Sequence, residues 1–248
     1  MKLLVQILAV LAVLEIKGVF GLLPPNITIC HRSDPHISDC IVNAIESIRD
    51  RLATGDLGDG YLVPPMEPFR INESNFGEEG GLRVFLRDLS IHGVSKFVIE
   101  KLRANPTDIK FDTLIYIPKL DIHGKYKMTF KFLGNLVNSD GDYYTQLTGP
   151  KLKFHMKGHR YMKDGQEFFK FEPFAVKFNR GKVSQLKISN LFGGNKLMGD
   201  IVHSIILSNP DFVLQNVYPK IEANLSKILT SLANKVVEKS SFDEMFPL

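Results

Sequence analysis

Apolar and polar residues alternate along the middle of the chain, from Leu82 to Ile188. Leu152, Phe154 and Met156 are separated by lysine and histidine, and this period of two is typical of a strand with one buried face. The same alternation predicts strands around 82–86, 115–117, 120–122, 126–130, 169–171, 176–178 and 183–188. Turn signals separate them at Ser139-Asp140-Gly141, Asp164-Gly165 and Asn179-Arg180-Gly181. The pattern predicts an antiparallel sheet with one apolar and one solvated face.

A helical period precedes the predicted sheet. Apolar residues at three- and four-residue spacing predict a helix from Cys40 to Ala53, with Ser38 or Asp39 as its N-cap. Gly55 is the expected end of this helix. The glycine-rich stretch that follows lacks the Lys-Ser/Thr of a phosphate-binding loop, so we expect turns there.

Helical spacing returns after the predicted sheet. Leu197 and Ile201 begin one apolar stripe, and a longer helix is predicted from Leu214 to Val236, kinked at Pro219. The apolar stripe of the longer helix is broad and requires a large apolar partner, for which the sheet is available. The order of helix, sheet and helix indicates an α+β fold.

The first 21 residues have the composition of a secretory signal peptide. Lys2 precedes an apolar run from Leu3 to Leu14, and small residues, Val19 and Gly21, stand before the expected cut. The run is too short to cross a bilayer, which needs about 20 apolar residues. A buried or amphipathic N-terminal helix is the alternative. We expect a secreted, extracellular protein with one domain over residues 22–248.

The chain has two cysteines, Cys30 and Cys40. In an oxidising compartment, an even number of cysteines at close spacing suggests a disulfide, whereas in cytosol two free thiols would be expected. A zinc site would need about four ligands, and no further cluster near His31 and His36 completes such a set.

Three Asn-X-Ser/Thr sequons fit the same compartment, and each predicts an N-glycosylation site. They begin at Asn26, Asn72 and Asn224. Asn72 lies in a polar stretch and is the best candidate for modification.

The charges are mixed along the chain, with a net charge of +4 and no basic block. A nucleic-acid partner is therefore not expected, because it requires a concentrated positive surface. The part of the sequence after the signal peptide has no run of 18 apolar residues, so stable membrane insertion is not expected either. No catalytic motif stands out, and we expect a protein that is not an enzyme and needs no cofactor.

Several motifs resemble the insect Takeout and juvenile-hormone-binding protein family, and they run in order over most of the chain. They are Ile29-Cys30-His31-Arg32-Ser33-Asp34-Pro35, Val63-Pro64-Pro65-Met66-Glu67-Pro68-Phe69, Asp88-Leu89-Ser90-Ile91-His92-Gly93, Ile117-Pro118-Lys119-Leu120, Asn190-Leu191-Phe192-Gly193-Gly194-Asn195 and Phe242-Asp243-Glu244-Met245-Phe246-Pro247. The resemblance implies a tubular-lipid-binding-like fold, in which a strongly curved antiparallel sheet wraps a long C-terminal helix around a hydrophobic tunnel. It also implies a cystine between Cys30 and Cys40.

Similar proteins carry juvenile hormones and other terpenoid or fatty-acyl molecules, and Takeout-like members are associated with circadian rhythm, feeding and chemosensation. The resemblance thus implies a monomeric carrier of a small hydrophobic ligand. A secreted interaction protein with a vestigial tunnel, acting through a surface receptor contact, is the alternative.

We predict the tunnel lining from strand and helix faces that must point inward, where large apolar side chains suit an adaptable wall. The predicted residues are Ile115, Ile117, Tyr126, Met128, Phe130, Phe154, Met156, Phe171, Val176, Phe178, Val213 and Val217. Tyr126, Tyr143 and Tyr144 are candidates for a polar end of the tunnel.

Overall fold

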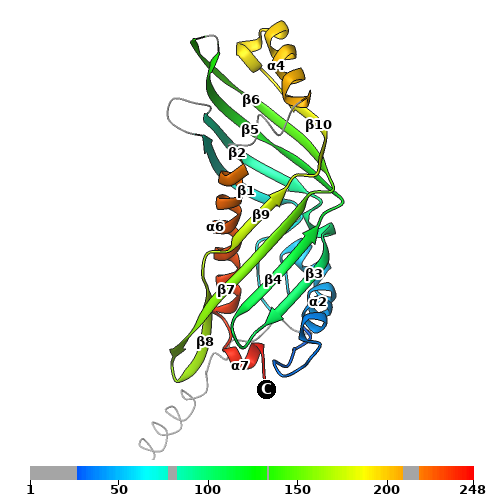
Figure 1. Cartoon of the computed structure of the whole chain (residues 1–248), viewed down its shortest axis with the longest axis vertical. Coiled ribbons are helices and arrows are strands. Elements are labelled where there is room, and N and C mark those ends of the chain that lie inside the picture. Colours follow the sequence, from blue (N-terminus) through cyan, green and yellow to red (C-terminus); the bar gives the residue numbers. More distant parts are fainter. Residues whose placement is uncertain (1–26, 78–82, 133, 209–217) are drawn as a thin grey trace, which may run out of the picture.

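The computed structural model describes residues 27–77, 83–132, 134–208 and 218–248. The predicted signal peptide, and the start of the long C-terminal helix expected from Leu214, lie outside these ranges. All strand pairs in the described part of the chain are antiparallel and form two groups that follow one another along the molecule (Figure 1).

The first sheet has the strand order β1-β2-β5-β6-β10. Its strands are β1 (Phe69–Gly77), β2 (Arg83–His92), β5 (Lys119–Phe132), β6 (Asn135–Thr148) and β10 (Lys182–Ile188). The second sheet has the order β3-β4-β7-β8, and β9 pairs with β7. Its strands are β3 (Val98–Asn105), β4 (Lys110–Tyr116), β7 (Lys151–Lys163), β8 (Gln166–Phe171) and β9 (Ala175–Asn179).

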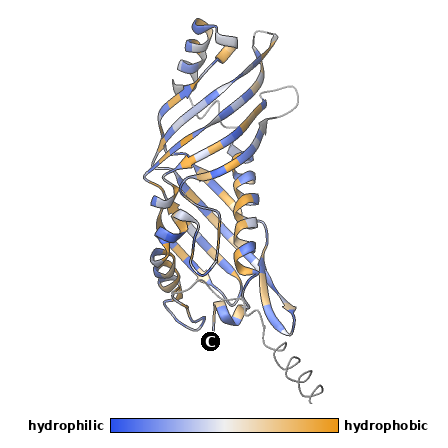
Figure 2. Ribbon diagram, turned by 180° about the vertical axis from the view of Figure 1, so that it is seen from behind, coloured by the Kyte–Doolittle hydropathy of each residue, from blue (hydrophilic) through white to orange (hydrophobic). Residues whose placement is uncertain are grey.

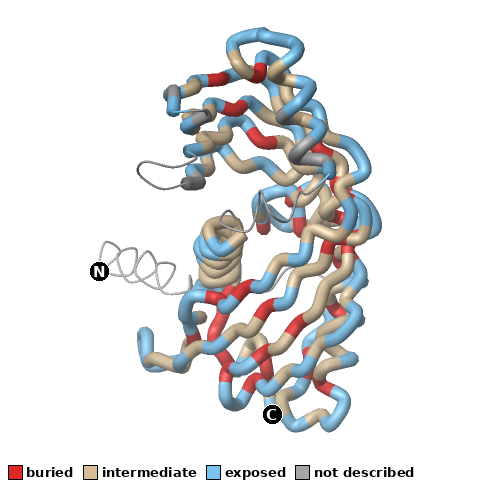
Figure 3. Tube along the Cα trace, turned by 45° about the horizontal axis from the view of Figure 1, so that its top comes forward, coloured by how far each residue is buried: buried red, intermediate tan, exposed pale blue. Residues whose placement is uncertain are grey.

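One long helix, α6, lies within the curve that the sheets form, as the view along the helix shows (Figure 3). The helical elements of the described chain are α2 (Ile37–Ser47), α3 (Arg49–Thr54), the 3-10 turns η1 (Val94–Lys96) and η2 (Leu191–Gly194), α4 (Lys196–Ser208), α6 (Tyr218–Val237) and α7 (Phe242–Met245). Pro219 lies in the first turn of α6, where a helix has no carbonyl partner for the missing N–H. The predicted α+β fold, with a curved antiparallel sheet around a C-terminal helix, is confirmed.

One predicted turn is wrong. Ser139-Asp140-Gly141 lies inside β6, where Gly141 faces Tyr126 of β5 in the strand register. A Cβ at Gly141 would lie 2.5 Å from Ser189 Oγ, so glycine is needed for the close approach of the chain after β10. The other two turn predictions are confirmed, because Gly165 and Gly181 have positive φ angles between β7 and β8 and between β9 and β10.

Three strands, β1, β3 and β6, were not predicted from the sequence. β1 lies between the glycine-rich turn at 55–60 and the predicted sheet, where no strand was predicted, and its sequence, FRINESNFG, has a weak apolar alternation. It forms because it pairs with β2 from Phe69 to Gly77. β3, with the sequence VIEKLRAN, likewise pairs with β4 over its length.

The first predicted helix also differs at its start. α2 begins at Ile37, and the helix is interrupted at Ile48 before α3. Neither Ser38 nor Asp39 is the N-cap, because both lie inside the helix, whose N-cap position is His36. Ser38 Oγ instead accepts a hydrogen bond from the Ala104 N–H of β3 at 3.0 Å. The predicted end is confirmed: Gly55 has a left-handed φ of 83°.

Polar and apolar residues alternate along the strands (Figure 2). The buried apolar side chains form three clusters among the described residues. The cluster at the C-terminal end of the molecule contains Phe169 and Phe242, whose side chains are almost inaccessible, together with Cys30. Phe242 begins α7, which Ser241 and Glu244 hold with a reciprocal capping box. The interior of the molecule at this end is therefore filled by packed side chains.

Candidate functional site

The interior next to α6 is built from apolar residues of the second sheet. Phe154, Phe174 and Val176 are buried together, and Leu225, Leu229 and Ala233 of α6 pack against them. The three helix residues are spaced by four positions, so they share one face of α6. This contact places the predicted sheet face against the predicted helix.

A second stripe of α6 is polar and binds the backbone of β8, β9 and the residues between them. Glu222, Ser226, Thr230 and Asn234 are also four positions apart. The bonded atoms are Phe178 N with Glu222 Oε1 at 3.1 Å, Ser226 Oγ with Phe174 O at 2.6 Å, Phe174 N with Thr230 Oγ1 at 2.9 Å, and Phe171 N with Asn234 Oδ1 at 2.8 Å. The stripe satisfies backbone groups that would otherwise be left without a partner on this side of the sheet. Sequence reasoning missed it, although its four-residue period was visible.

Seven of the predicted lining residues lie in the packed clusters around the second sheet. Ile117, Phe154 and Val176 are buried, and the others are partly buried at the edges of these clusters: Ile115, Met156, Phe171 and Phe178. The fold brings these seven side chains to the interior side of the second sheet. Val213 and Val217 lie outside the described residues.

Three further predicted lining residues, Tyr126, Met128 and Phe130, lie on β5 in the first sheet. Tyr126 is buried, and its hydroxyl donates a hydrogen bond to Ser189 O at 2.7 Å. Met128 and Phe130 are partly buried, and the ring of Phe130 meets Phe192 at 5.3 Å. The predicted lining is therefore divided between the two sheets rather than gathered in one cluster.

The tyrosines that were candidates for a polar end have different surroundings. Burial raises the pKa of Tyr126 to about 12, with a smaller contribution from Asp140. Burial also raises the pKa of Tyr143 to about 12, and a hydrogen bond with Thr145 acts in the opposite direction. Tyr144 faces away from the core, and its hydroxyl donates to Asp121 Oδ1 at 3.0 Å. Tyr126 and Tyr143 thus remain neutral phenols at neutral pH, and the proton of the Tyr126 hydroxyl is already bonded to Ser189 O.

Two open clefts lie at the first sheet. One, of about 490 Å³, lies beside β5 and β6 and is lined by Asp88, His123, Gly124, Lys125, Asp142, Tyr143, Tyr144, Lys187 and Ser189. The other, of about 600 Å³, lies between β1 and α6 and is lined by Arg70, Ile71, Asn72, Glu73 and Ile228. The second cleft borders the helix that the sheets surround.

A serine–histidine pair lies on the solvated face of the first sheet. Ser90 Oγ is 3.2 Å from His92 Nε2, and His92 Nδ1 is 3.2 Å from Glu67 Oε1. The Glu67 carboxylate also accepts hydrogen bonds from the N–H of Gly93 and the hydroxyl of Ser95. These bonds hold the turn after β2, and the pair faces away from the apolar interior.

The part of the chain that the structure describes holds no group of three or more His, Cys, Asp and Glu side chains that could bind a metal ion. Among the described helices, none combines the length and apolarity needed to span a membrane.

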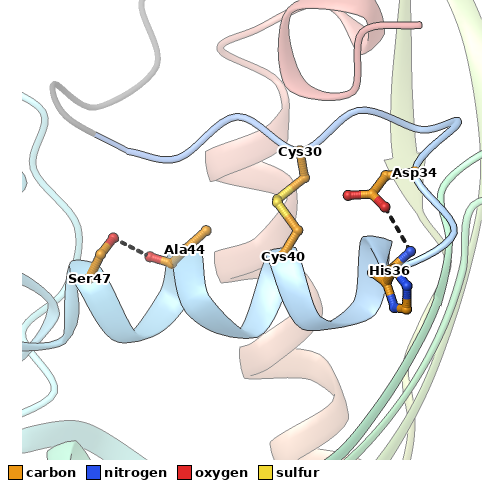
Figure 4. The surroundings of a disulfide bond; sticks show 6 residues. All are labelled: Cys30, Asp34, His36, Cys40, Ala44 and Ser47. Carbon is orange, nitrogen blue, oxygen red and sulfur yellow. Dashed lines mark hydrogen bonds between the residues drawn. A yellow bond between two sulfur atoms is a disulfide. The ribbon is translucent and has the colours of Figure 1, made fainter.

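The two cysteines form the expected disulfide, which joins the extended segment before α2 to that helix (Figure 4). Cys30 is buried in the same cluster as Phe242. Asp34 Oδ1 accepts a hydrogen bond from the His36 N–H at 2.7 Å and shapes the loop between the cysteines. The disulfide thus fastens the N-terminal segment to the packed end of the molecule.

The sequence matches a family model, that of haemolymph juvenile hormone binding protein (JHBP), over residues 5–247. The chain belongs to the JHBP family. A search of curated protein sequences gives no significant match. The family resemblance inferred from the sequence motifs is therefore confirmed.

A solved structure shares the fold of this chain. The crystal structure of Takeout 1 from Epiphyas postvittana matches with a TM-score of 0.72 at 19% sequence identity, over 89% of this chain and 100% of that chain. The structure of lipopolysaccharide binding protein gives a TM-score of 0.30 at 13% identity, over 78% of this chain and 39% of that chain, which is too low to indicate a shared fold.

Proposed function

We propose that the protein is a secreted, monomeric carrier that binds a small hydrophobic ligand between the sheets and α6. The observation that carries this proposal is the position of α6 within the curve of the two sheets (Figure 3). Apolar side chains of the second sheet pack against α6 there. Each buried methylene of a ligand contributes about 0.8 kcal/mol. A terpenoid or fatty-acyl chain could therefore bind without any charged partner.

Family membership supports the ligand class, because the family is described as juvenile hormone binding proteins of haemolymph. The disulfide supports secretion, since such bonds persist in oxidising compartments. In this proposal, the lining is formed by the twelve predicted residues, and the hydroxyls of Tyr126 and Tyr143 can meet a polar end of the ligand. Binding, exclusion of water and release are sufficient for such a carrier, so no catalysis is required.

The test is to secrete the protein from insect cells and examine it by native mass spectrometry and solvent extraction. We expect one copy of the chain with one co-purifying lipid, and competition between that lipid and a fluorescent fatty acid. A protein without lipid that also fails to bind the fluorescent fatty acid would contradict the carrier. It would favour the alternative of an interaction protein that acts through its surface.

A further inference from the structure

We infer that the ligand enters the interior sideways, between β1 and α6, through the cleft lined by Ile71 and Ile228. The inference rests on the proposed carrier function and adds the route of exchange. It follows from a difference in how strongly α6 is bound to the strands on its two sides.

On one side, α6 is fastened to β8, β9 and the residues between them along most of its length. The polar stripe from Glu222 to Asn234 bonds to the backbone of that region at four successive turns. Glu222 also forms an ion pair with Lys177 of β9 at 2.8 Å. The apolar side chains of Leu225 and Leu229 pack beneath the same contact. Separation on this side would break many interactions at once.

On the other side, α6 contacts β1 through fewer residues than it contacts β8 or β9. Asn224 Nδ2 of α6 donates a hydrogen bond to Ser74 Oγ of β1 at 3.0 Å. β1 is the edge strand of the first sheet, so it has a strand partner, β2, on one side only. The cleft of about 600 Å³ lies in this contact. Contacts that are few and solvent-accessible open more readily than a packed core.

Asn224 and Ile228 are four positions apart, so both point from α6 toward β1. On β1, Ile71 pairs with Leu89 of β2, which is buried, and therefore lies on the interior side of the sheet. The two isoleucines give the cleft apolar walls, whereas the side chains of Arg70 and Glu73 are exposed at its rim. This arrangement suits a single-chain amphiphile whose tail passes inward and whose polar end stays near the rim.

The decisive experiment closes this contact with a covalent link. Ser74→Cys and Asn224→Cys are introduced together and joined with a short bifunctional thiol reagent, which is feasible because both native cysteines are in a disulfide. Binding and release of a fluorescent fatty acid are followed by stopped-flow. We expect both rates to fall at least tenfold, with Kd changed less than twofold, and to recover after cleavage of the link.

The matched control closes the opposite side of α6 with Lys177→Cys and Glu222→Cys, residues that already form an ion pair. This link should leave both rates within twofold of the unlinked protein. Asn224→Ala is a second variant that needs no crosslink, and we expect it to exchange ligand about threefold faster at unchanged Kd. Unchanged exchange in both the Ser74–Asn224 linked protein and Asn224→Ala would overturn the lateral route. Absence of binding by the unmodified protein would instead overturn the carrier function itself.

Discussion

Asn234 of α6 forms two hydrogen bonds with a single residue of β8, Phe171. The Phe171 N–H donates to Asn234 Oδ1 at 2.8 Å, and Asn234 Nδ2 donates to the Phe171 carbonyl oxygen at 3.0 Å. The side-chain amide thus pairs with the strand end as a neighbouring strand would. The long helix therefore provides hydrogen-bond partners for the backbone of β8 and also packs inside the curve of the sheets.

Replacing Asn234 by alanine should lower the free energy of unfolding by about 2 kcal/mol, because two partly buried backbone groups of Phe171 lose their partners. Urea unfolding measures this loss. Lys235→Ala is the control, since Lys235 is exposed at the next position. Equal stabilities of the two variants would show that the paired hydrogen bonds contribute nothing.

Removing the disulfide with Cys30→Ser and Cys40→Ser should cost about 2.5–3 kcal/mol, because the bond closes a loop between residues ten positions apart. Urea unfolding of the double variant, compared with the oxidised protein, gives the value. Thiol titration of the denatured, unreduced protein should find no free thiol. Two titratable thiols would contradict the bond.

Tyr126 and Tyr143 should ionise late in a pH titration of the native protein, with pKa values of about 12. Their pKa values are raised above the unfolded value of about 10, so their contribution to stability is complete below pH about 10 and is lost as the pH rises through about 12. Phenolate absorbance follows the ionisation, and Tyr126→Phe and Tyr143→Phe should each remove one late-ionising group. If a Tyr→Phe variant instead lacked a group that ionises at about pH 10, the replaced tyrosine would be exposed to solvent and the prediction would be wrong.

Ligand binding should depend on the face of β5 that a residue occupies. Met128→Glu puts a carboxylate toward the interior, and we expect it to weaken binding of a fluorescent fatty acid at least tenfold, whereas Lys127→Glu at the exposed neighbouring position should change binding less than twofold. Thermal unfolding of both variants checks that the native fold is kept. Equal weakening by the two changes would place the ligand elsewhere.

Asn72 and Asn224 should differ in whether they are glycosylated. Asn72 is exposed on β1, whereas the Asn224 amide bonds Ser74 in the contact between β1 and α6. Peptide mapping of protein secreted from insect cells should find a glycan on Asn72 and none on Asn224. Asn72→Gln should then reduce the mass by one glycan, and Asn224→Gln should leave glycosylation unchanged. A glycan on Asn224 would be incompatible with the observed contact. Asn26 lies outside the described residues.

The amino-acid sequence alone determined the succession of a helical, a strand-rich and a second helical region, because the periods of two and of about 3.6 residues can be read locally. Leu152, Phe154 and Met156 alternate so regularly that β7 was predictable with its buried face, and Gly55 was predictable as a helix end. The family motifs also indicate the curved sheet and the enclosed helix.

Only the tertiary structure decided features whose cause lies far away along the chain. Gly141 resembled a turn residue, but it is required by the approach of Ser189. β1 has little alternation of its own and forms by pairing with β2. The stripe from Glu222 to Asn234 finds its partners at Phe171, Phe174 and Phe178, which are 44 to 63 positions away. Local sequence shows which groups can form hydrogen bonds, but the long-range packing of the chain selects their partners.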